Sequence, residues 1–185
     1  GNRKPDAENG VVRANNPGRV MRALAFSLLA LMLPAQIAGA GEFFTLKGHG
    51  GPVKGLAVAP DGTIASAGFD NAVGVWDGLT PRWLDDHRAA VNVLAFAGPD
   101  QLLSAGDDFR VLAWDLSSGL PQLRHQHQGK VMGLAVSPDE RFAASASWDG
   151  SIGLQDLGNG KTHTLTGHRS GVNAVTFSAD GNRLI

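Results

Sequence analysis

Histidine, serine and aspartate, three residue types that can do chemistry together, recur as a set along this chain. In each set a His precedes an apolar stretch, a Ser follows that stretch, and an Asp stands four residues beyond the Ser. Such a set could act as a hydrolase triad, in which the His accepts the proton of the Ser hydroxyl and the Asp orients the His. The three sets are His49, Ser66 and Asp70; His87, Ser104 and Asp108; and His127, Ser145 and Asp149.

The repetition of the set argues against catalysis. An enzyme needs one such site, whereas this chain carries three at corresponding positions, and it has no Gly-x-Ser-x-Gly segment to present a nucleophilic Ser. We therefore predict no enzyme activity and no cofactor.

Other chemistry-bearing motifs are weaker. His125 and His127 stand two residues apart, so they share one face of a strand and could both face a metal, but no third ligand is nearby. We expect His125 to be a solvent-facing strand residue and predict no metal site. The pairs Asp85-Asp86 and Asp107-Asp108 lack the oxygen-rich loop that calcium needs. The stretch GNGKT at 158–162 predicts a hairpin turn rather than a phosphate loop.

The elements that must position these residues form a repeat of about 40 residues. His49, His87, His127 and His168 follow one another at steps of 38, 40 and 41 residues. After each, an alternating apolar stretch ends at a turn, and three further short strands follow, which indicates a small antiparallel sheet in each unit. Stacking such sheets radially buries their faces, as in the blades of a β-propeller. The units span about 43–80, 81–120, 121–160 and 161–185.

The repeat resembles the WD-repeat family. Gly-His dipeptides stand at 48–49 and 167–168, and Trp-Asp dipeptides at 76–77 and 114–115. The resemblance covers residues 43–185. It implies an all-β fold: a partial β-propeller of antiparallel four-stranded blades, with three complete units and the start of a fourth.

The resemblance also implies a structural role for the recurring sets. In the family, His, Ser, Asp and Trp of one repeat form a hydrogen-bonded tetrad. Trp148 aligns with Phe69 and Asp107, just before the turn Asp, so Gln155 occupies the third Trp position. We expect its amide to donate a hydrogen bond, and the third unit to be weaker by about 1–3 kcal/mol. The implied tetrads are His49, Ser66, Asp70 and Trp76; His87, Ser104, Asp108 and Trp114; and His127, Ser145, Asp149 and Gln155.

Partners of the family usually dock on the face that carries the His loops and the Asp turns. The resemblance therefore implies a protein or peptide partner there. Trp148 suits an anchor role, with local packing against the next blade as the alternative. The candidate contact residues, all expected to be exposed, are Phe69, Asp107, Trp148, Lys54, Asn92, Met132 and Asn173.

Composition narrows the function classes. The chain is 43% hydrophobic and 18% charged, as in globular proteins, and its net charge of −1 argues against a nucleic-acid partner. It contains no cysteine, which excludes disulfides, thiolate metal sites and a c-type haem attachment site within these residues.

The N-terminal segment predicts export. Residues 1–20 are polar and without periodicity, typical of a disordered leader or an over-long start. Residues 21–40 have the layout of a cleavable signal peptide: Arg22, an apolar stretch to Leu33, and small residues at 38–40. A membrane anchor is the alternative, but the apolar stretch is short for a span. We expect a periplasmic or secreted protein, without a membrane span after cleavage.

Three and a half blades leave the ring open. We expect the chain to be a fragment of a longer, bacterial exported WD-repeat protein. Its alternative is a half-propeller that pairs with another chain, and the open blade edges favour association in either case. The predicted function is an exported protein-binding scaffold; the alternative is a module of a larger periplasmic redox protein with a c-type cytochrome domain beyond residue 185.

Overall fold

The computed structural model describes residues 45–185, so the predicted leader (1–20) and signal segment (21–40) lie outside the described residues. Within residues 45–185 all regular elements are strands, and none of the described residues forms a helix long and apolar enough to cross a membrane. The strands are β1 (Val53–Val58), β2 (Ile64–Gly68), β3 (Val73–Asp77), β4 (Thr80–Leu84), β5 (Val91–Phe96), β6 (Gln101–Gly106), β7 (Arg110–Asp115), β8 (Pro121–Gln126), β9 (Val131–Val136), β10 (Phe142–Ser147), β11 (Ile152–Asp156) and β12 (Thr162–Leu165).

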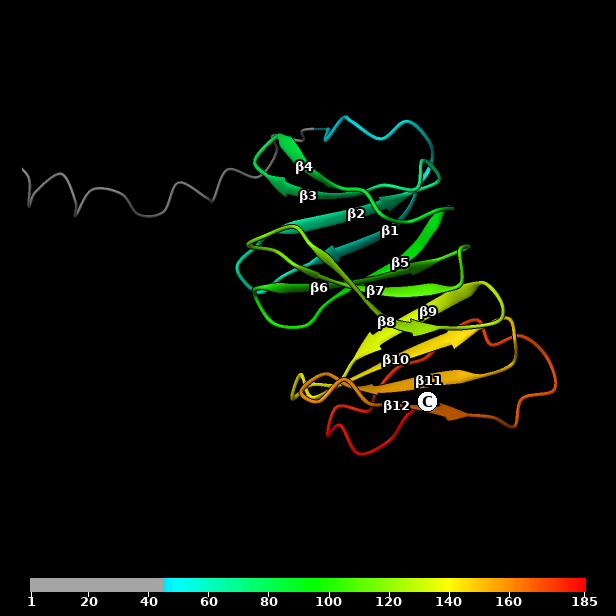
Figure 1. Ribbon diagram of the computed structural model, residues 1–185. Coiled ribbons are helices and arrows are strands. Elements are labelled where there is room, and N and C mark those ends of the chain that lie inside the picture. Colours follow the sequence, from blue (N-terminus) through cyan, green and yellow to red (C-terminus); the bar gives the residue numbers. More distant parts are fainter. Residues whose placement is uncertain (1–44) are drawn as a thin grey trace, which may run out of the picture. The chain divides into compact units, whose positions relative to one another are not determined.

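The strands form three four-stranded antiparallel sheets, each a simple meander: β1 to β4, β5 to β8, and β9 to β12 (Figure 1). Short turns with Asp, Gly or Asn join them, because these residues tolerate the tight backbone that a two-strand connection needs. The predicted all-β partial propeller of four-stranded blades is thereby confirmed. The first sheet ends at Leu84, so each sheet takes its fourth strand from the start of the next repeat unit.

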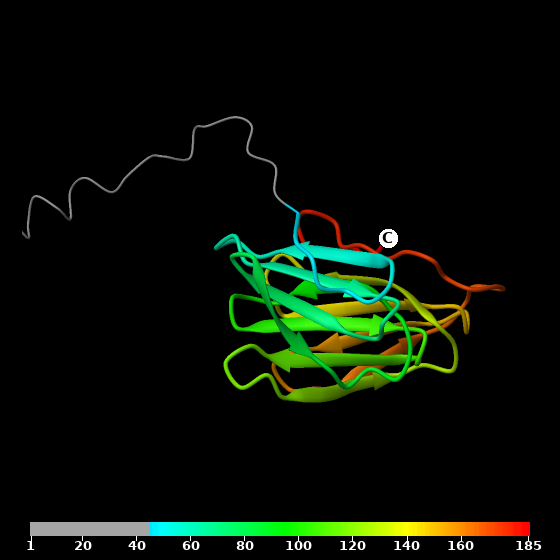
Figure 2. The ribbon, with the colours of Figure 1, turned by 90° about the horizontal axis from the view of Figure 1, so that it is seen from above.

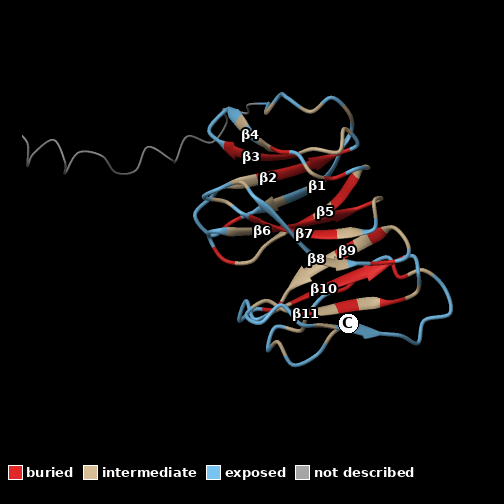
Figure 3. Ribbon diagram, in the orientation of Figure 1, coloured by how far each residue is buried: buried red, intermediate tan, exposed pale blue. Residues whose placement is uncertain are grey.

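The sheets stack side against side, with β1 against β5 and β5 against β9 (Figures 1 and 2). Glycine allows the backbones to approach at these contacts. A Cβ at Gly55 would lie 3.0 Å from the Asn92 carbonyl oxygen of β5, and where β9 meets the start of the fourth unit a Cβ at Gly133 would lie 2.9 Å from the Ala174 Cα. The second strand of every blade is largely buried, whereas many of the turns are exposed (Figure 3).

The two seams between complete blades differ in their apolar content. The seam between the first and second blades holds one continuous cluster of ten buried side chains, including Leu84, Leu112 and Trp114. At the next seam the buried apolar residues divide into two small clusters, around Leu103 and Val131. Since buried apolar area is the main stabilising contribution, the second seam is the weaker one.

The start of a fourth unit packs on the third blade. Val172 and Val175 are buried against Ala144 and Ala146, and the chain then turns back on itself through a bridge between Phe177 and Leu184. These residues cover the side of the third blade that the second blade does not cover.

At the other end of the stack an apolar strand face is open. Leu56 in β1 is 69% exposed, whereas Leu94, its counterpart in β5, is 9% exposed because the first blade covers it. Association through this face stays a prediction.

Candidate functional site

In the first blade, hydrogen bonds from the His49 side chain link its own loop to strand β2 and to the β2–β3 turn. Its Nδ1–H donates to the carboxylate of Asp70 at 2.9 Å, and its Nε2 accepts from the Ser66 hydroxyl at 2.7 Å. The Trp76 indole N–H donates to the same Ser66 oxygen at 2.8 Å. Asp70 also accepts from the Gly50 amide at 2.6 Å, which ties the loop after His49 to the β2–β3 turn.

The second blade repeats this network. His87 Nδ1 lies 2.8 Å from Asp108, and its Nε2 lies 2.7 Å from Ser104 Oγ. The Trp114 indole donates to Ser104 at 2.7 Å. Ser104 is completely buried, and its hydroxyl is used by both His87 and Trp114. No substrate can reach it, so the arrangement holds turns in place and does not form a nucleophile.

The carboxylates of these networks are stabilised in their ionised form. Burial acts to raise the pKa of Asp108, but the hydrogen bonds from His87 and from the Arg88 and Arg110 amides outweigh it, and the pKa is lowered. For Asp70, burial is likewise outweighed by the hydrogen bonds from His49 and the Gly50 amide, so its pKa is lowered too.

The third blade keeps part of the network. His127 bonds Asp149 at 3.1 Å and Ser145 at 2.8 Å, and its Nδ1 also lies 3.2 Å from Ser151 Oγ. Burial acts to raise the pKa of Asp149, yet hydrogen bonds from the Ser151 hydroxyl and the Gln128 amide hold it well below its usual range.

The prediction that the Gln155 amide donates a hydrogen bond is wrong for the described residues. Gln155 is 2% exposed, and neither its amide nitrogen nor its carbonyl oxygen has a hydrogen-bond partner among residues 45–185. The expected donation is absent there because the Gln155 amide forms no hydrogen bond to Ser145, which corresponds to the Ser66 and Ser104 acceptors of the indoles in the other blades. A third buried atom without a partner in these residues, Arg124 Nε, lies on β8 of the neighbouring blade.

His125 corrects a second prediction. It is half-buried rather than solvent-facing, because β8 carries it across the seam onto the third blade. A Cβ at Gly153 would lie 2.7 Å from the His125 ring, whose centroid is 4.4 Å from that of His127. Burial lowers the pKa of His125, and the neighbouring His127 lowers it further. Burial also lowers the pKa of His127, against the opposing effect of Asp149.

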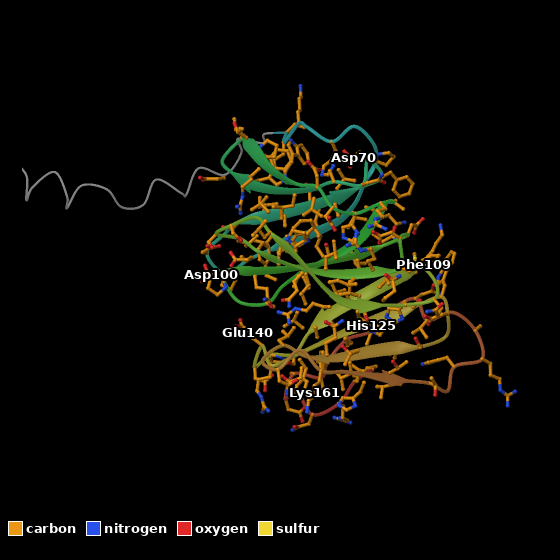
Figure 4. The ribbon with its side chains drawn as sticks, viewed as in Figure 1. Asp70, Asp100, Phe109, His125, Glu140 and Lys161 are labelled. Atoms are coloured by element: carbon orange, nitrogen blue, oxygen red, sulfur yellow. The ribbon has the colours of Figure 1, made fainter. Side chains whose placement is uncertain are left out.

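The turns after β2, β6 and β10 lie on one side of the stack. Figure 4 shows Asp70 and Phe109 on this side, and Asp100 and Glu140 on the opposite side. The structure places the candidate contact residues here, but it does not expose them all. Lys54 and Asn173 are exposed, Phe69 and Trp148 are 53% and 52% exposed, and Asp107 and Met132 are partly buried.

Asn92 corrects a third prediction, since it is 6% exposed. Its amide donates to Asp107 at 2.8 Å and to the Val131 carbonyl at 3.1 Å, so it joins the second and third blades rather than facing solvent. Asp107 in turn forms a salt bridge with Lys130.

The Trp148 side chain is half exposed, yet its neighbours fix its orientation. Its indole N–H donates to Asn173 at 2.7 Å, and Lys130 Nζ lies 5.9 Å from the ring centroid. Beside it is an open hollow of about 420 Å³, lined by Trp148, Ser170, Gly171 and Asn173. The ring therefore presents apolar surface in a fixed orientation.

Sequence reasoning missed three residues of this face: Arg88, Phe109 and Arg169. Each is exposed, and each stands directly after a recurring His or Asp. An alignment of the residues after the recurring His and Asp could have revealed them.

Antiparallel four-stranded blades pinned by His, Ser, Asp and Trp define a class, the WD-repeat propellers. The model of the family "WD domain, G-beta repeat" matches residues 42–77, 120–156 and 159–185, together more than half of the chain. The chain belongs to this WD40 repeat family. The unmatched residues include β5 to β7, which together with β8 nevertheless form a blade with a complete network.

Curated relatives show the same membership. The chain is 30% identical to the ribosome biogenesis protein WDR12 homolog of Nematostella vectensis, over 73% of this chain and 35% of the relative. It is 30% identical to the guanine nucleotide-binding protein subunit beta of Solanum tuberosum, over 69% and 40%. With a periodic tryptophan protein 2 homolog of Dictyostelium discoideum it shares 27%, over 77% and 17%. The chain thus spans less than half the length of these eukaryotic relatives.

Proposed function

We propose that this chain is a non-catalytic scaffold that binds a segment of a protein partner on the face of the β2–β3, β6–β7 and β10–β11 turns. The observation that carries the proposal is Trp148, a half-exposed indole oriented by Asn173 beside an open hollow. Large aromatic side chains on rigid supports are the residues that most often dominate protein interfaces. Membership in a family of interaction scaffolds supports the same role.

The test compares two alanine variants of the full chain. Trp148→Ala removes the proposed anchor, whereas Leu120→Ala removes a 69% exposed side chain from the β7–β8 turn, on the opposite side. Peptides selected on the wild-type chain should lose at least about tenfold in affinity with Trp148→Ala, as expected of an interface anchor. They should bind Leu120→Ala unchanged. Equal affinity for wild type and Trp148→Ala would refute the proposed face.

Export to the periplasm or the medium, as a bacterial protein, is the second part of the proposal. It is supported by the sequence of residues 21–40, while the relatives compared above are eukaryotic. N-terminal sequencing of the protein from an exporting host should give Gly41 as the first residue, and Ala40→Arg should prevent cleavage. An uncleaved wild-type product would overturn this part. Nothing among residues 45–185 favours the redox-module alternative.

A further inference from the structure

Phe109 has an unusual backbone conformation at an exposed turn. It follows Asp108 with a φ of 68° and is 36% exposed. The corresponding residues in the other blades are Asn71, at φ 67°, and Gly150, at φ 85°. Asn and Gly tolerate this left-handed region, whereas a bulky aromatic residue rarely adopts it. A strained residue at a solvent-facing position is a candidate for function, because packing does not require it there.

Hydrogen bonds connect Phe109 to the Trp148 turn. The Phe109 carbonyl accepts from the His127 amide at 2.9 Å, and the His127 ring bonds Asp149, the residue after Trp148. The two aromatic residues therefore lie on turns that flank one loop, the loop that begins at His127.

The charges around these aromatics are unevenly exposed. The carboxylates of the three His networks lie inward and are engaged: the side chains of Asp70, Asp108 and Asp149 are 19%, 5% and 13% exposed, and each bonds a His. The more exposed Asp86 is paired with Arg110. Arg88 and Arg169, in contrast, are exposed, and neither forms a salt bridge with the described residues.

Both arginines stand next to an aromatic turn. The Arg88 amide donates to Asp108, the neighbour of Phe109. Arg169 lies between His168 and Ser170, whose carbonyl oxygens are 3.4 and 3.5 Å from a Cβ placed on Gly150, two residues after Trp148. Cations thus flank the two aromatic residues, while the carboxylates of the His networks beneath them are already hydrogen-bonded.

We propose that the partner segment is acidic: an extended stretch with Asp or Glu around an aromatic or other large apolar side chain. Phe109 and Trp148 would contact the apolar side chain, and Arg88 and Arg169 would pair with its carboxylates. This inference rests on the proposed function and specifies its ligand. Single-stranded nucleic acid also combines aromatic stacking with cations, but the inward carboxylates and the net charge of −1 disfavour a polyphosphate here.

Peptides are selected from a random displayed library for binding to the full chain, and peptides that also bind the Trp148→Ala variant are removed by counter-selection. The expected peptides carry Asp or Glu next to a large apolar residue. Their affinity should fall about two- to fivefold for each of Arg88→Gln and Arg169→Gln, and the loss should shrink as salt is raised. Lys161→Gln, an exposed change on the opposite side, is the matched control.

The outcomes separate the two proposals. Peptides that depend on Trp148 but show no acidic enrichment would overturn this inference and leave the proposed face intact. Failure to obtain any Trp148-dependent peptide would overturn both. Displacement of the selected peptides by an oligouridylate of ten nucleotides would favour nucleic acid and overturn the acidic-segment proposal.

Phe109→Asn gives a second, independent test. In the first blade the corresponding turn position is occupied by Asn71, which has the same backbone conformation, so the melting temperature of Phe109→Asn should stay the same or rise. Affinity for the selected peptides should nevertheless fall at least about fivefold, because an aromatic contact is lost. A variant with wild-type affinity would exclude Phe109 from the binding face.

Discussion

Replacing Gln155 by methionine should stabilise this protein. Gln155 is 2% exposed, and both polar atoms of its amide lack a partner among residues 45–185. Burying an amide without hydrogen bonds costs about 1–3 kcal/mol on mutational scales. Methionine has nearly the same shape and no strong polar group, so it keeps the packing and removes this cost.

The expected gain is therefore about 1–3 kcal/mol in the free energy of unfolding, or about 3–10 °C in melting temperature for a domain of this size. Thermal unfolding followed by circular dichroism measures it directly. Gln122→Met is the matched control, since Gln122 is exposed on β8 and its replacement should change little. An equal or lower melting temperature for Gln155→Met would mean that the amide is satisfied in solution and that the reasoning is wrong.

Three further predictions concern the same networks. Gln155→Trp should stabilise the third blade more than Gln155→Met, because its indole should donate to Ser145 as Trp76 donates to Ser66 beside Gly74. A melting temperature below that of Gln155→Met would show that the seam has no room for the indole. Ser104→Ala should cost about 1–3 kcal/mol in urea unfolding, because it leaves the buried Trp114 N–H without its acceptor, whereas Ser170→Ala at an exposed site should cost almost nothing. Stability should also fall as pH drops through about 6.5, since the lowered pKa values of His125 and His127 mean that the unfolded chain binds more protons there. His125→Asn should make the melting temperature depend less on pH between pH 7.5 and 5.5. His163→Asn, on exposed β12, should leave that pH dependence unchanged.

The sequence predicts the fold here because its evidence is local and repeated. Alternating apolar stretches, turn residues and the spacing from His to Ser to Asp recur in every unit, so each unit supports the interpretation of the others. The bonding atoms of the first two networks follow from the same spacing. His49 meets Asp70 and Ser66, and His87 meets Asp108 and Ser104, because identical spacings on identical strands bring the same atoms together.

The features that sequence reasoning missed depend on contacts between blades. Asn92 is buried because its amide reaches the Val131 carbonyl of the next blade, which its own unit does not reveal. His125 is half-buried because the neighbouring blade has Gly153 at the contact, where the corresponding residue of the second blade is Leu112. A pattern read within one unit cannot identify such pairs, since both members must be placed first. The left-handed backbone of Phe109 differs from these, because an alignment with Asn71 and Gly150 would have shown it.

The candidate anchor lies on the blade that meets the second blade through the weaker of the two seams. Trp148 precedes Asp149, whose network lacks the indole donor, and this blade meets its neighbour through the seam with the smaller apolar clusters and the unpaired Gln155 amide. Segments with fewer stabilising contacts open locally at lower free energy than the rest of a domain. A partner that contacts both Phe109 and Trp148 would bridge this seam, so binding should add stability at the weaker of the two seams. Stability and affinity are therefore coupled at the seam between the second and third blades, whereas substitutions at the first seam should change stability alone.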